Sequence, residues 1–147
     1  MEFLVKLKSN DFFATAVISW FIAQLLKVLI SLLKTKSIDF KLFVASGGMP
    51  SSHSAFVMGL TGALGFKVGW ESPLTAMALV LSLVVMYDAA GVRRAAGKQA
   101  AILNRLIFDS NNDKKLTEKR LKELLGHTPI EVIFGAILGL VVSYLIV

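Results

Sequence analysis

The chain has 147 residues, of which 55% are hydrophobic, and a mean hydropathy of +0.69. Soluble domains are usually about 45–50% apolar, so this composition argues against a small soluble protein and favours a membrane protein. The lack of cysteine excludes disulfides and thiolate chemistry, and the net charge of +6 is expected to orient membrane spans rather than to bind nucleic acid.

Four apolar segments predict an all-α integral membrane bundle that forms a single domain over residues 1–147. The expected spans are residues 11–33, 54–70, 74–90 and 129–147. The first lacks a short apolar core followed by a small-residue cleavage site, so it is expected to be retained rather than removed as a signal peptide. The second is short for a hydrocarbon core of about 30 Å.

Two polar residues, Gln24 and Lys27, interrupt the first span and share one helical face because they are three residues apart. Polar groups at membrane depth usually point toward protein or water. A lysine can instead extend its side chain to the membrane interface. The sequence does not decide whether the Lys27 side chain points toward protein or water, or extends to the membrane interface.

Residues 34–53 and 91–128 form two long polar connections. In the second, apolar residues recur at helical spacing, which predicts two amphipathic helices on the membrane surface. Residues 109–113 between them resemble a calcium loop only faintly and are not expected to bind a metal. Most lysines and arginines fall in the two connections, so the positive-inside rule places both in the cytoplasm and both termini outside.

Residues 47–54, Gly-Gly-Met-Pro-Ser-Ser-His-Ser, are typical of a loop that opens a helix. Glycines allow a close backbone approach, and a helix N-terminus presents unpaired N–H groups that favour an anion such as phosphate. The same residues suit an ordinary N-cap in front of a membrane helix.

The two histidines of the chain, His53 and His127, precede the second and fourth expected spans and therefore lie at the same membrane face. Near neutral pH, two histidines can supply a nucleophile and a general acid beside a phosphate group held by cations and hydroxyls. Zinc is the competing use, with Asp88 and Glu131 as further ligands, and the surrounding cations disfavour it.

Residues 50–53 resemble the Pro-Ser-Gly-His motif of type 2 phosphatidic acid phosphatases, a superfamily related to vanadium haloperoxidases. Residues 47–55, 88–93 and 126–132 together resemble its small divergent bacterial and plant branch over nearly the whole chain. The resemblance implies dephosphorylation of a lipid phosphate or pyrophosphate at headgroup depth, with no metal or other cofactor.

The first motif of that superfamily is a lysine, six residues and then Arg-Pro. Lys34 and Lys41 have this spacing, but lysine replaces the arginine and Leu42 the proline. A lysine lacks the bidentate fork of an arginine, so the phosphate would be held more loosely. The second motif matches at Pro50, Ser51 and His53, with Ser52 in place of glycine.

The third motif is Ser-Arg, five residues, a histidine, three residues and an aspartate. His127 and Glu131 fit its last part, with glutamate for aspartate, whereas Leu121 stands at the arginine position and Arg120 lies one residue away. Thr128-Pro129-Ile130-Glu131 is also a capping box, which is an equal alternative role for Glu131.

The cation missing from the third motif can come from the preceding connection. The candidates there are Arg93, Arg94 and Lys98. Asp88 is expected to pair with Arg93 or Arg94 and so to order them, rather than to take part directly in catalysis.

The resemblance assigns roles to the site residues. His127 would attack phosphorus to form a phosphohistidine, Glu131 would orient the His127 ring, and His53 would protonate the leaving oxygen. The residues expected to hold the phosphate oxygens are Lys34, Lys41, Gly48, Ser51, Ser52, Arg93, Arg94 and Arg120.

Members of the superfamily usually build this site within about six helices, so four spans are expected to need a homodimer. Two other functions stay open. The altered first and third motifs are compatible with a protein that binds phosphate or a lipid headgroup without catalysis. Gln24 and Lys27 within a span are compatible with a small transporter subunit.

Overall fold

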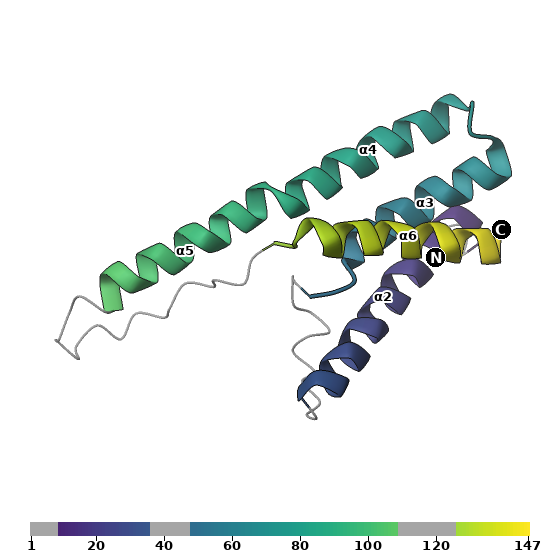
Figure 1. Ribbon diagram of the computed structural model, residues 1–147. Coiled ribbons are helices and arrows are strands. Elements are labelled where there is room, and N and C mark those ends of the chain that lie inside the picture. Colours follow the sequence, from purple (N-terminus) through teal and green to yellow (C-terminus); the bar gives the residue numbers. More distant parts are fainter. Residues whose placement is uncertain (1–8, 36–47, 109–125) are drawn as a thin grey trace, which may run out of the picture.

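The computed structural model describes residues 9–35, 48–108 and 126–147, and these residues form helices and short connections without a strand. The helices are α2 (Asp11–Thr35), α3 (Ser52–Val68), α4 (Pro73–Ala90), α5 (Val92–Phe108) and α6 (Pro129–Ile146) (Figure 1). The four predicted spans coincide with α2, α3, α4 and α6 to within two residues at each end. The all-α membrane bundle predicted from the sequence is confirmed.

Among the described residues, three stretches are long and apolar enough to cross a membrane. They are Asp11–Leu33, Pro73–Asn104 and Pro129–Ile146. The 17-residue helix α3 is not among them, although it packs against α2, α4 and α6 and is the most enclosed helix. The crossing of the membrane by α3, and with it the four-span topology and its cytoplasmic orientation, stays a prediction.

The first amphipathic helix predicted for residues 91–128 is present as α5, and it continues the line of α4 (Figure 1). Its location on the membrane surface stays a prediction. Helical hydrogen bonds run through Gly91, whose N–H donates to the Tyr87 carbonyl at 2.8 Å and whose carbonyl accepts from the Ala95 N–H at 2.9 Å. No proline or polar loop separates the two helices, so the chain has no reason to turn. The second predicted amphipathic helix lies outside the described residues.

Helices α3 and α6 cross at glycines. A Cβ atom on Gly139 would lie 2.5 Å from the carbonyl oxygen of Ala55 and 2.7 Å from the amide nitrogen of Gly59. Gly135 packs in the same way against the carbonyl of Ser51. Small residues allow this backbone-to-backbone approach in membrane bundles. The crossing therefore fixes the start of α3 relative to the start of α6.

Large apolar side chains cover the outside of the bundle rather than its inside. On α2 the exposed positions recur every four residues, from Phe21 to Leu33, with Leu33 74% exposed. The interior holds small and hydroxyl-bearing residues, and a Thr61–Ser82 hydrogen bond of 2.8 Å joins α3 to α4. Large apolar residues on the outside and small residues on the inside are expected of helices whose outer faces contact lipid.

The far end of α3 has the residues of a membrane interface. Lys67 forms an ion pair of 2.6 Å with Asp11, and the Phe66 ring stacks edge-on with Trp70 and Tyr144. Aromatic residues gather at the headgroup level of membranes. The 17 residues of α3 span about 25 Å, so the histidines lie at the opposite end of the bundle from this belt.

Candidate functional site

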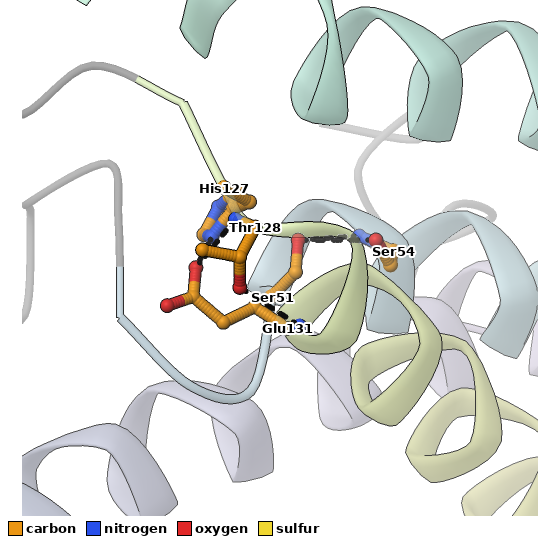
Figure 2. Close-up of polar contacts among 5 residues, drawn as sticks. All are labelled: Ser51, Ser54, His127, Thr128 and Glu131. Atoms are coloured by element: carbon orange, nitrogen blue, oxygen red, sulfur yellow. Dashed lines mark hydrogen bonds and ion pairs between the residues drawn. The ribbon is translucent and has the colours of Figure 1, made fainter.

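Helix α6 begins with a capping box that also contacts a histidine (Figure 2). The Glu131 N–H donates to Thr128 Oγ1 at 3.3 Å, and the Thr128 N–H donates to Glu131 Oε2 at 3.1 Å. The same Oε2 atom lies 3.1 Å from His127 Nδ1. The two roles left open for Glu131 are therefore compatible, because one carboxylate both caps the helix and orients the ring.

The His127 residue is held through its backbone as well as its ring. Its backbone N–H donates to the Ala89 carbonyl at the end of α4, at 2.9 Å, and the residue is 2% exposed. The Glu131 carboxylate at Nδ1 favours the tautomer with its proton on Nδ1 and a free lone pair on Nε2. Nε2 is buried and makes no well-formed hydrogen bond with any described residue.

His53, the second residue of α3, lies beside His127. The ring centroids are 5.9 Å apart, with an interplanar angle of 65°. His53 Nδ1 is also buried without a hydrogen-bond partner in the described part of the chain. Buried polar atoms without a hydrogen-bond partner are rare in folded proteins, which marks the two rings as candidates for a functional role. The fold thus brings together the two histidines that are more than seventy residues apart in sequence.

Ser51 is the N-cap of α3. Its hydroxyl accepts hydrogen bonds from the Ser54 N–H at 3.4 Å and the Ser54 hydroxyl at 3.0 Å (Figure 2). Its own N–H donates to the Glu131 carbonyl at 3.0 Å. The interpretation as a helix cap is confirmed, and the Ser51 N–H is already engaged. Ser52, the first residue of α3, is buried.

The junction of α4 and α5 packs against the residue that precedes His127. Arg93 Nε forms a 2.7 Å ion pair with Asp88 Oδ2, which confirms the predicted pairing. Gly126, with φ of +88°, packs against the backbone of Arg93 and Arg94. A side chain at Gly126 would be strained in this conformation and would also collide with that backbone. The contact places Arg93 close enough for its charge to act on His53.

Lys27 belongs to this site, although the sequence analysis did not include it. The residue is 3% exposed, and its side chain lies along Gly48, where a Cβ would be 3.3 Å from Lys27 Cγ. Its charge acts on Glu131. Lys27 therefore faces protein rather than extending to the membrane interface. The sequence signal was its position within a span beside Gln24, which is also buried.

The other predicted phosphate ligands are less well placed by the structure. Lys34 stands in the last turn of α2, and its side chain, like Lys41 and Arg120, lies outside the described residues. Arg94 and Lys98 are exposed on α5. Within residues 9–35, 48–108 and 126–147, no three His, Asp or Glu side chains come together as a metal site.

Both histidines have lowered pKa values. Burial lowers the pKa of His127 below its usual value, although the hydrogen bond with Glu131 and the backbone of Gly48 oppose this effect. Burial also lowers the pKa of His53, and nearby positive charges add to it. The charged and titratable groups that act on His53 are Arg93, His127, Lys27 and, in the opposite sense, Asp88. Both rings are therefore neutral at neutral pH in the free protein.

Comparison with known proteins places the chain in a family. Residues 8–142 match the family described as "Divergent PAP2 family". The chain is also 40% identical over 132 residues to an uncharacterised membrane protein, YuiD, of Bacillus subtilis (strain 168), an alignment that covers 82% of this chain and 84% of that protein. No solved structure shows significant similarity. The chain is thus a membrane protein that belongs to the divergent branch of the type 2 phosphatidic acid phosphatase superfamily.

Proposed function

We propose that this protein is a membrane phosphatase that hydrolyses a lipid phosphate or pyrophosphate through a phosphohistidine intermediate on His127. The observation that carries the proposal is the environment of the two nitrogen atoms of the His127 ring. Nδ1 is 3.1 Å from the Glu131 carboxylate, whereas Nε2 is buried beside His53 without a well-formed hydrogen bond to a described residue. A nucleophile oriented by one group and adjacent to an acid is the arrangement that covalent catalysis needs.

The reaction has two steps. His127 Nε2 attacks phosphorus, the bond from phosphorus to the leaving oxygen breaks, and His53 gives that oxygen a proton. Water then attacks the phosphohistidine, His53 takes a proton from it, and the P–N bond breaks to release phosphate. Glu131 stabilises the positive charge that develops on the His127 ring in the first step. The ring centroids of the nucleophile and the acid lie 5.9 Å apart.

The phosphoryl oxygens would be held by cations from two directions. Arg93, at the start of α5, pairs with Asp88, and its charge acts on His53. Lys34 and Lys41 stay candidates from the end of α2 and the following connection, as does Arg120. The Ser51 N–H is a weaker candidate because the Glu131 carbonyl already accepts it. A lipid substrate is supported by the position of the site at one end of a bundle whose outer face is apolar.

The proposal is tested by phosphate release from a panel of lipid phosphates and pyrophosphates, measured in detergent for the wild type and for His127→Ala. Release by the wild type and its loss in His127→Ala are expected. No release from any substrate, with phosphate still bound, would favour the alternative of a binding protein that has lost catalysis. Unchanged release by His127→Ala would exclude the mechanism.

The pH profile of kcat/KM is expected to peak on the acid side of pH 6.5, the usual pKa of a histidine. Activity needs His53 protonated, so it falls as pH rises through the lowered pKa of His53. Activity also needs His127 neutral, so it falls as pH drops through the lowered pKa of His127. A bound phosphate dianion raises the pKa of His53, so the alkaline limb of kcat should lie at higher pH than that of kcat/KM. Initial rates across the pH range check both limbs, and a kcat/KM peak on the alkaline side of neutrality would contradict the assignment.

A further inference from the structure

Lys27 is a buried charge within a membrane-span segment. It lies less than two turns before the end of the apolar segment Asp11–Leu33, and it is 3% exposed. A charge at such a depth is costly unless it meets a polar or charged group. Its Cγ and Cδ atoms lie 3.3 and 3.4 Å from the point where a Gly48 Cβ would stand, so the side chain bends toward the loop before α3.

The charge of Lys27 acts on three groups of the candidate site. It is attracted by Glu131, and it disfavours the protonated forms of His53 and His127. The Lys27 side chain is therefore within electrostatic range of both rings. The Glu131 carboxylate also accepts the Thr128 N–H and faces His127 Nδ1. The Glu131 carboxylate thus serves a helix cap and a ring, and its charge also acts on Lys27.

We propose that Lys27 is a phosphate-binding residue, whose ammonium group is shared between Glu131 and a phosphoryl oxygen of the substrate. This inference rests on the proposed function. An ammonium group has three N–H donors, so it can serve a carboxylate and a phosphoryl oxygen at once. Arg93 approaches His53 from α5, and Lys27 supplies a second cation from α2. A cation that is already in place where charge develops in a water-poor site stabilises the transition state.

The test compares Lys27→Met and Lys27→Gln with the wild type in detergent. Turnover of a short-chain lipid phosphate is measured together with the binding of orthovanadate and inorganic phosphate. Loss of the charge is expected to lower kcat/KM by about 10²- to 10³-fold and to weaken the binding of both anions. Lys67→Met is the matched control, because it removes an exposed lysine at the opposite end of the bundle, and it should change neither quantity.

A second experiment distinguishes direct phosphate binding by Lys27 from an indirect effect of Lys27 through Glu131. It combines Lys27→Met with Glu131→Gln. If Lys27 binds phosphate itself, the double variant binds orthovanadate more weakly than Glu131→Gln does. Equal affinities in those two variants, or wild-type affinity in Lys27→Met and Lys27→Gln, would overturn the inference and leave the proposed function standing. A wild type that binds neither anion and releases no phosphate would overturn both. Competition of inorganic phosphate with the lipid phosphate shows which of them the site prefers.

Discussion

Replacing His127 by glutamine is expected to lower kcat by about 10⁴- to 10⁶-fold, the usual loss when a catalytic nucleophile is removed. A glutamine side chain is close in size to histidine, so the buried site should keep its packing, but an amide nitrogen cannot attack phosphorus. Wild-type protein that is quenched during turnover of a radiolabelled substrate should carry acid-labile label, as a phosphoramidate does. His127→Gln should carry none, and retained label would place the nucleophile elsewhere.

His53→Gln is the control that separates the acid from the nucleophile. An alkoxide is a poor leaving group, so loss of the general acid should slow hydrolysis of an alkyl phosphate by about 10²- to 10⁴-fold. A nitrophenolate leaves without a proton, so the release of nitrophenolate from an aryl phosphate in the first turnover should be nearly normal in His53→Gln. His127→Gln should be inactive on both substrates. Equal losses on both substrates in His53→Gln would argue that His53 binds phosphate rather than protonating the leaving group.

Gly139→Ala is expected to destabilise the bundle by about 1–3 kcal/mol and to reduce activity, although Gly139 lies about two turns of α6 away from the site. The added methyl group would stand 2.5 Å from the Ala55 carbonyl oxygen and 2.7 Å from the Gly59 nitrogen, and backbone cannot move aside as a side chain can. Helices α3 and α6 must therefore separate. Thermal unfolding in detergent, followed by tryptophan fluorescence or circular dichroism, measures the loss.

Val141→Ile is the matched control for Gly139→Ala. It adds a single methyl group to the same helix, but Val141 is 50% exposed on the lipid-facing side. Its stability and activity should equal those of the wild type. If Gly139→Ala is as stable as Val141→Ile, the close crossing of α3 and α6 is not what holds the bundle together.

The helices were predictable from the sequence because their signals are local. Each of the four expected spans carries a long apolar run, and α6 starts where Thr128, Pro129 and Glu131 form a capping box. The two histidines were predicted to be neighbours because each precedes an expected span and the expected topology puts both at one membrane face. These inferences need only hydropathy, helix length and the number of expected crossings between the two residues.

The remaining features depend on tertiary contacts. The direction of the Lys27 side chain depends on Gly48 leaving room for its methylene groups, which no local pattern reports. The engagement of the Ser51 N–H by the Glu131 carbonyl joins two residues that are far apart in the sequence. A periodic pattern shows that α5 is amphipathic, but it does not show that Gly91 lets helical hydrogen bonding continue from α4.

The glycine crossing of α3 and α6 fixes the backbone around the two histidines independently of the side chains on the outer face of the bundle. At Gly135 and Gly139 the two helices meet backbone against backbone, so repacking of ordinary side chains cannot move the start of α3 relative to the start of α6. Under the proposed function, adaptation to a different lipid substrate would come from residues outside the crossing. Randomising the exposed apolar positions would explore such substrates and leave the crossing unchanged.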